Sequence, residues 1–200
     1  MSKLNSSLSL LASLLYGVLT LVALAWAWWS GRPNLLWLPE TTGAMHVISA
    51  VMGLALGLVV AAATHLAARM AWLDRLSSFF ASTLGPIGWR PAFQLALLSS
   101  IGEEIFFRGA MQPALGLWLT TLIFGALHLP PRLSLASWTL LATILGLAFG
   151  LLMEQTGSIS GPILAHFTIN FLNLRLVGRK GEALQAPPQR TGTIKVSKRS

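Results

Sequence analysis

The chain has 200 residues, of which 54% are hydrophobic and 10% are charged, and its formal net charge is +8. A soluble domain usually has about 25% charged residues because its surface must face water, so this composition excludes an ordinary water-soluble protein. The absence of cysteine excludes disulfides, thiolate nucleophiles and cysteine-bound metals. Several apolar runs reach the roughly 20 residues that cross a bilayer. We therefore expect an all-α, polytopic transmembrane helical bundle of about six spans, with a buried polar site between helices.

The first apolar run covers residues 8–29. A cleaved secretory signal peptide is an alternative, because Ala-Leu-Ala at residues 23–25 resembles a cleavage site. However, the run is longer than a typical signal-peptide core, and only Lys3 precedes it as a basic residue. We favour an uncleaved first transmembrane helix, followed by a proline-containing loop at residues 31–42.

The second apolar run covers residues 43–69 and contains Gly53 and Gly57. Small residues at this spacing let another membrane helix approach closely. Glycine is also common in membrane helices in general, so both interpretations stay open. Residues 71–82 mix charged residues with large apolar ones, which favours a short helix lying in the membrane interface.

Four further spans are expected in the second half of the chain. They cover residues 92–115, 117–129, 134–154 and 162–177, with a turn near Gly116 between the first two. Gly146 and Gly150 form a second close-packing pair. We assign residues 1–177 to one integral membrane domain, whose motif-bearing core covers about 92–177. Residues 178–200 are predicted to be a basic, disordered tail.

The basic residues predict the orientation. Seven of them lie at or beyond the end of the last apolar run: Arg175, Arg179, Lys180, Arg190, Lys195, Lys198 and Arg199. Lysine and arginine are enriched on the cytoplasmic side, so we expect both termini in the cytoplasm and the chain in the plasma (inner) membrane. No folded basic face is visible, and nucleic acid is therefore not an expected partner.

Glu103 and Glu104 lie side by side within an apolar segment of a chain that has only six acidic residues. A charge at the bilayer centre costs on the order of 3 kcal/mol. Arg108 lies four residues beyond Glu104, so the two side chains share a helix face and can form an ion pair. Such a pair could simply specify helix packing. That alternative leaves Glu103 unexplained, because it points about 100° away from Glu104.

Three further polar residues lie in apolar helices. These are His128 and the i, i+4 pair His166 and Asn170. A lone histidine in a membrane helix is more often a packing residue than a catalyst, but two of them with an asparagine and an unpaired glutamate favour a site. If the chain turns at Gly116, Glu104 and His128 are each 12 residues from the turn. They would then lie at the same depth, roughly 18 Å along their helices.

Three motifs contain these residues. Residues 103–108 match EExxxR, residues 124–128 match FxxxH and residues 166–170 match HxxxN. In this order, they resemble the CPBP family, which contains the type II CAAX prenyl endopeptidases and bacteriocin-processing relatives. The resemblance covers about residues 92–177. Each motif is weak alone, but three in order within apolar helices are quite specific.

The resemblance implies an intramembrane glutamic endopeptidase that acts on a membrane-associated protein or peptide and needs no cofactor and no metal. By position, Glu103 would be the general base that activates a water, and His128 would hold and polarise that water. His166 and Asn170 would donate hydrogen bonds to the tetrahedral oxyanion. We therefore expect Glu103 to lie within about two hydrogen-bond lengths of His128.

In the same comparison, Glu104 and Arg108 would form the ion pair that fixes the helix and orients the base. The closest alternative is a zinc enzyme with His128, His166 and Glu103 as ligands, although the chain has no HExxH motif. Another alternative is a non-enzymatic membrane protein, such as an immunity or partner-binding factor or a small transporter. Intramembrane charges also mark ion pathways.

Overall fold

The computed structural model describes residues 3–32 and 34–186, and almost all of them are helical. The order is α1 (Lys3–Trp29), α2 (Gly43–Leu66), η1 (Ala67–Arg69), α3 (Ala71–Leu84), α4 (Trp89–Glu104), η2 (Ile105–Met111), α5 (Gln112–Leu127), η3 (Leu133–Leu135), α6 (Ser137–Thr156) and α7 (Ser160–Gln185). Within these residues there is no strand, and a single isolated β-bridge joins Trp37 to Ser158. The chain is an all-α membrane helical bundle, as the composition predicts.

Four helical segments of the described chain are long and apolar enough to cross a membrane. They are Ser7–Trp29, Gly43–Arg69, Trp89–Leu127 and Ser137–Thr156. The predicted third span lies within Trp89–Leu127, and the predicted fourth span, residues 117–129, overlaps the end of the same segment. The predicted sixth span forms the 26-residue helix α7, which is not among the four. Large apolar side chains cover the outer surface of α1 and α2, as a lipid-facing surface requires.

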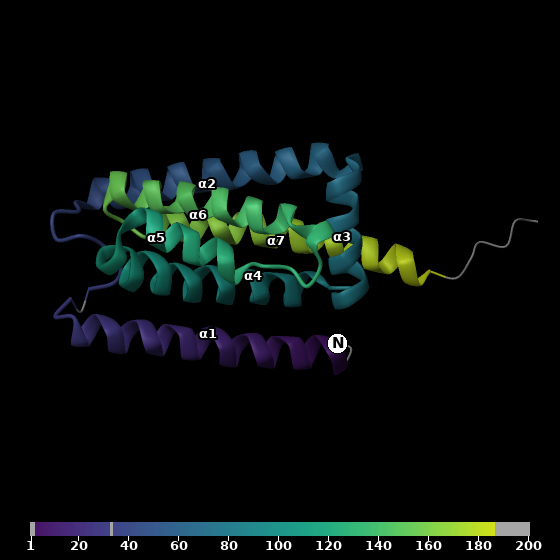
Figure 1. Ribbon diagram of the computed structural model, residues 1–200, viewed down its shortest axis with the longest axis horizontal. Helices are drawn as coiled ribbons and strands as arrows, with labels where there is room; N and C mark the ends of the chain where they lie inside the picture. Colours follow the sequence, from purple (N-terminus) through teal and green to yellow (C-terminus); the bar gives the residue numbers. More distant parts are fainter. Residues whose placement is uncertain (1–2, 33, 187–200) are drawn as a thin grey trace, which may run out of the picture.

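The long helices lie side by side, and α3 lies across one end of them (Figure 1). α2 and α4 both pack against α7, and α5 packs against α6. α1 runs along the outside of the bundle next to α4 and η2 (Figure 1). The polar residues of α4, α5 and α7 are therefore brought into one interior, with α1 covering one side of it.

The first glycine pair lets α2 and α7 pack closely. A Cβ atom at Gly53 would collide with the backbone of Gly161, and one at Gly57 would come within 2.7 Å of the Thr168 Cβ. Both positions therefore need glycine for the observed packing, which confirms the close-approach interpretation of this pair.

A reversal at Gly116 divides the segment Trp89–Leu127. Gly116 has φ 79° and ψ 167°, outside helical values, and a residue with a side chain is strained at such a positive φ. The turn predicted there is confirmed. Between α4 and this turn, η2 (Ile105–Met111) is a π-helix. This form is rare in proteins as a whole, but where it occurs it often lies at a functional site.

The last helix continues beyond residue 177, the C-terminal boundary that the sequence predicts for the membrane domain. α7 continues beyond Val177 to Gln185, so the prediction of disorder is wrong for residues 178–185. Gly178 looks like a helix breaker in the sequence, but here its missing side chain makes room for the backbone of Ile87. Residues 187–200, the rest of the predicted tail, lie outside the described residues.

Candidate active site

A buried ion pair connects α4 to the π-helix. Glu104 ends α4 with 0% exposure, and Arg108 lies within η2 with 1% exposure. The Arg108 Nε lies 3.2 Å from the Glu104 Oε2, at ion-pair distance but without hydrogen-bond alignment. The Arg108 Nη2 donates a 2.7 Å hydrogen bond to the Gly146 carbonyl on α6. The pair predicted from the i, i+4 spacing therefore forms, and it also ties η2 to α6.

Aromatic rings surround the Arg108 guanidinium. Its Cζ lies 4.8 Å from the ring centre of Phe124, 5.7 Å from that of Phe149 and 5.8 Å from that of Phe107. A cation over ring faces gains electrostatic stabilisation, and more so when it is removed from water. The rings help explain how a fully buried guanidinium is tolerated between apolar helices.

Glu104 also binds His166, a contact that the sequence spacing does not reveal. The His166 Nδ1 lies 2.8 Å from the Glu104 Oε1. The imidazole stacks on Phe149 at 5.4 Å between ring centres, which fixes the plane of the ring. Since an ionised carboxylate only accepts hydrogen bonds, Nδ1 carries the proton and Nε2 is the nitrogen available to another group.

Glu103 and His128 face each other across α4 and the end of α5. Their Oε2 and Nε2 atoms are 3.9 Å apart, with side-chain exposures of 13% and 21%. This is too long for a direct hydrogen bond but within the two hydrogen-bond lengths expected from the sequence. The Glu103 Oε2 is buried without a hydrogen-bond partner. Such an atom is costly to leave unsatisfied, so it is an acceptor open to a further donor such as a water molecule.

The orientation of His128 is set by the backbone. Its Nδ1 lies 2.7 Å from the Phe124 carbonyl, which can only accept, so Nδ1 donates. Thr139 donates a 3.0 Å hydrogen bond to the His128 carbonyl and anchors the end of α5. In the neutral ring, Nε2 is therefore the unprotonated nitrogen, and it is the one that faces Glu103.

Asn170 reaches α4 from α7, one helical turn beyond His166. Its Nδ2 donates a 3.0 Å hydrogen bond to the Ser99 Oγ. Ser99 is buried and lies one turn before Glu103 on α4. Nothing in the sequence pattern singles out Ser99, although its position four residues before Glu103 places it on the same face of the helix.

Tyr16 is a further neighbour of Glu103 that the sequence does not reveal. It lies in α1 and packs against Gly102, the residue before Glu103, where its phenol and the Glu103 carboxylate interact. α1 carries none of the three motifs, so its contribution to this interior comes only from tertiary packing.

The zinc ligand set considered from the sequence does not form. Across residues 3–32 and 34–186, no three histidine, aspartate or glutamate side chains are grouped so that they could hold a metal ion. The His166 Nδ1 is already bonded to Glu104. The donor geometry therefore gives the zinc alternative no support.

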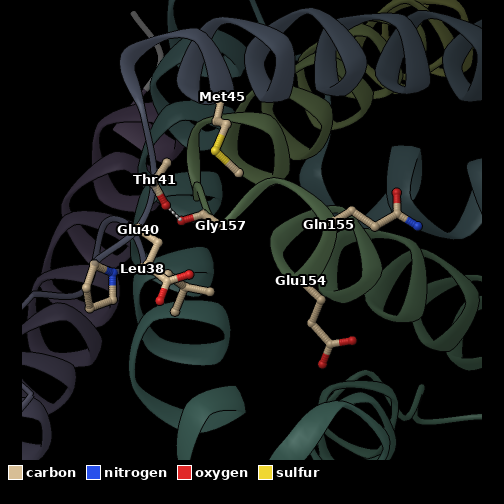
Figure 2. A pocket seen from close by; sticks show the side chains of 8 residues that line it. Leu38, Glu40, Thr41, Met45, Glu154, Gln155 and Gly157 are labelled. Atoms are coloured by element: carbon tan, nitrogen blue, oxygen red, sulfur yellow. Dashed lines mark hydrogen bonds between the residues drawn. The ribbon is translucent and has the colours of Figure 1, made fainter.

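A separate cavity of about 390 Å³ lies where the loop after α1 meets the turn between α6 and α7 (Figure 2). It is lined by Leu38, Pro39, Glu40, Thr41, Met45, Glu154, Gln155 and Gly157. A neighbouring cavity of about 180 Å³ shares Leu38 and Glu154 with it and reaches Arg108. Glu103 and His128 line neither of these two cavities.

Comparisons with known proteins show which family this part of the chain resembles. Residues 86–172 match the family model described as type II CAAX prenyl endopeptidase Rce1-like. Through these residues, the chain is similar to the CAAX protease family. The match includes all six residues singled out by the motifs, and it confirms the resemblance drawn from them.

A curated relative of this chain is the uncharacterized protein YpbD of Bacillus subtilis (strain 168). The two are 41% identical over 78 residues, which make up 38% of this chain and 40% of YpbD. The matched segment thus spans well under half of the relative. No solved structure matches the chain.

Proposed function

We propose that this chain is an intramembrane endopeptidase in which Glu103 and His128 activate a water molecule. The substrate is a peptide bond of a membrane-associated protein or peptide. The main support is the buried Glu103 Oε2, which has no hydrogen-bond partner and lies 3.9 Å from the His128 Nε2. One water can contact both atoms at ordinary hydrogen-bond lengths, with the carboxylate and the imidazole as acceptors.

The proposed reaction consumes this water. Glu103 takes one proton while the water oxygen attacks the carbonyl carbon of the substrate, and a tetrahedral oxyanion forms. The C–N bond then breaks, and Glu103 returns the proton to the leaving amine. Because the water itself is the nucleophile in this reaction, no covalent enzyme intermediate forms.

His166 and Asn170 are proposed to stabilise the oxyanion. The His166 Nδ1 already donates to Glu104, so its Nε2 donates only when the ring carries a second proton. The Glu104 carboxylate at 2.8 Å stabilises that imidazolium. Asn170 uses one N–H for Ser99 and has a second one available.

Glu104 and Arg108 are proposed to act through this histidine. Arg108 holds one carboxylate oxygen of Glu104 at 3.2 Å, and His166 binds the other at 2.8 Å. The ion pair therefore fixes the imidazole on α7 and, through the helix backbone, the neighbouring Glu103. Its role is to orient the reacting groups rather than to contact the substrate.

We also propose in which membrane the protein lies and on which side its termini are. The basic residues beyond α6 favour a plasma (inner) membrane protein with both termini in the cytoplasm. The family name points to prenylated protein C-termini, and a non-prenylated membrane peptide is the other substrate source. Both sources share an extended peptide bond presented at the membrane, and the experiment below separates them.

The decisive test replaces Glu103 by glutamine, which keeps the size of the side chain and removes the base. Membrane-protein and peptide profiles of cells with wild-type chain and with Glu103→Gln identify a cleaved peptide. That synthetic peptide and a farnesylated CAAX peptide are then assayed with the purified protein in liposomes. We expect Glu103→Gln to lose at least about 100-fold in kcat while its thermal unfolding is unchanged.

Glu182→Gln is the matched control, because Glu182 is an exposed glutamate on α7 outside this interior. It should cleave at the wild-type rate. Full activity of Glu103→Gln, or the absence of any peptide that depends on Glu103, would refute the proposed function. Cleavage of the farnesylated peptide alone would assign the prenylated source.

A further inference from the structure

Tyr16 is the single tyrosine of a chain that has 8 tryptophans and 9 phenylalanines. It lies half-buried in the middle of α1, where it packs against Gly102 and its phenol interacts with the carboxylate of the next residue, Glu103. The segment matched to the family begins only at residue 86. The one phenol of the protein is therefore placed beside the proposed base by a helix outside the matched segment.

The contact between α1 and α4 is built at this point. A Cβ atom at Gly102 would lie 2.9 Å from the Tyr16 Cβ and 3.2 Å from its Cδ1. The neighbour of Glu103 must therefore be glycine for Tyr16 to sit this close. Farther along α1, Trp26 packs edge-on against Phe106 at 6.1 Å between ring centres. These two contacts hold α1 in register with the residues on either side of Glu103 and Glu104.

We propose that Tyr16 is a positioning residue for Glu103. Its hydroxyl donates to the carboxylate from the α1 side, while His128 approaches from the α5 side at 3.9 Å. A glutamate side chain has three rotatable bonds, and a fixed donor limits the orientations that the carboxylate adopts. The Glu103 Oε2, which has no hydrogen-bond partner, is then held toward the His128 Nε2.

The chemical identity of the donor matters. A lysine or arginine at this place would bind the carboxylate as an ion pair and weaken it as a base. A phenol adds no positive charge, so it orients the carboxylate with less loss of basicity. The geometry assigns α1 a part in the site, although it carries no motif.

This inference rests on the proposed function, and its test is the Tyr16→Phe variant. Phenylalanine keeps the ring that packs on Gly102 and removes only the hydroxyl. With the same liposome assay and peptide, we expect kcat to fall about tenfold with KM within about twofold. A purely structural role would lower the unfolding temperature instead, and we expect that temperature to stay at its wild-type value.

Thr20→Val is the matched control on α1. The Thr20 hydroxyl lies one turn beyond Tyr16 and donates to the Tyr16 carbonyl at 2.8 Å, so its removal also deletes one hydroxyl from this helix. It should leave kcat unchanged. A wild-type kcat in Tyr16→Phe, or an equal loss in Thr20→Val, would overturn the inference.

A second variant keeps the test independent of the phenol itself. Gly102→Ala inserts a methyl group where Tyr16 packs, so it should displace the hydroxyl and lower kcat severalfold. In the double variant with Tyr16→Phe, the two losses should not add, because both act on one contact. Full additivity would contradict the inference. If Glu103→Gln is inactive while Tyr16→Phe is unaffected, the proposed function stands and only the role of Tyr16 is lost.

Discussion

Glu103 and Glu104 are neighbours in the sequence, yet they lie in different surroundings. Glu104 is fully buried. The Arg108 guanidinium lies 3.2 Å from one of its carboxylate oxygens, and the His166 imidazole lies 2.8 Å from the other. Glu103 is slightly exposed, and its nearest basic group is His128 at 3.9 Å. Because adjacent helical residues point about 100° apart, a step of one residue along α4 separates a carboxylate held by charged groups from one that is open to a water molecule.

The difference shows how a helical bundle in lipid tolerates two adjacent glutamates. A buried carboxylate that lies between two basic groups connects three helices: α4, α6 through Arg108, and α7 through His166. Its neighbour can then stay without a hydrogen-bond partner on one oxygen, because the backbone around it is fixed. Substitutions around Glu104 should therefore lower folding stability, whereas substitutions around Glu103 should lower kcat.

The largest effect is expected on the Glu104 side. Arg108→Ala removes the buried cation and leaves Glu104 without its ion-pair partner, so we expect a loss of about 3–5 kcal/mol in the free energy of unfolding. Cleavage should fall together with the yield of folded protein. Thermal unfolding in detergent measures this. Arg90→Ala, which removes an exposed arginine from the start of α4, should leave the unfolding unchanged.

The next effect is expected on the Glu103 side. His128→Ala removes the imidazole that faces the base, so kcat should fall about 100-fold or more. The unfolding temperature should stay close to wild type, since the ring is 21% exposed and makes no ion pair shorter than 3.9 Å. His65→Ala, at an exposed histidine of α2, is the control. A folding defect in His128→Ala as large as that of Arg108→Ala would contradict the distinction between the surroundings of Glu103 and those of Glu104.

The smallest effect is expected at Ser99, which orients the proposed oxyanion donor. Ser99→Ala deletes the acceptor of the Asn170 hydrogen bond and should lower kcat by about three- to tenfold. The neighbouring Ser100 is also buried, but its hydroxyl bonds only within α4, to the Leu97 carbonyl. Equal kinetic losses in Ser99→Ala and Ser100→Ala would show that helix packing alone explains the effect.

The sequence predicts the part of this interior that depends on local geometry. The i, i+4 spacing of Glu104 and Arg108 gives their ion pair, and the turn at Gly116 gives the depth at which α5 returns. The spacing placed His128 level with Glu104, but Glu103 is the residue that faces it. Depth follows from counting residues, whereas the rotation of one helix against another depends on packing.

Contacts between distant helices could not be predicted in this way. The bond from His166 to Glu104 joins residues 62 apart, and Tyr16 approaches Glu103 from a helix without a motif. The end of α7 was also missed, because the fit of Gly178 against Ile87 becomes visible only in three dimensions. Local spacing shows which residues can pair within one helix, and tertiary packing decides their remaining partners.

The π-helix at Ile105–Met111 makes this arrangement sensitive to chain length. It lies between the two glutamates and the reversal at Gly116, with no loop in between to absorb an inserted or deleted residue. Gain or loss of one residue in the α-helical turns on either side of it would rotate everything after that point by about 100°. Whatever variation the family tolerates in its loops, the number of residues between the acids and this hairpin is expected to stay constant.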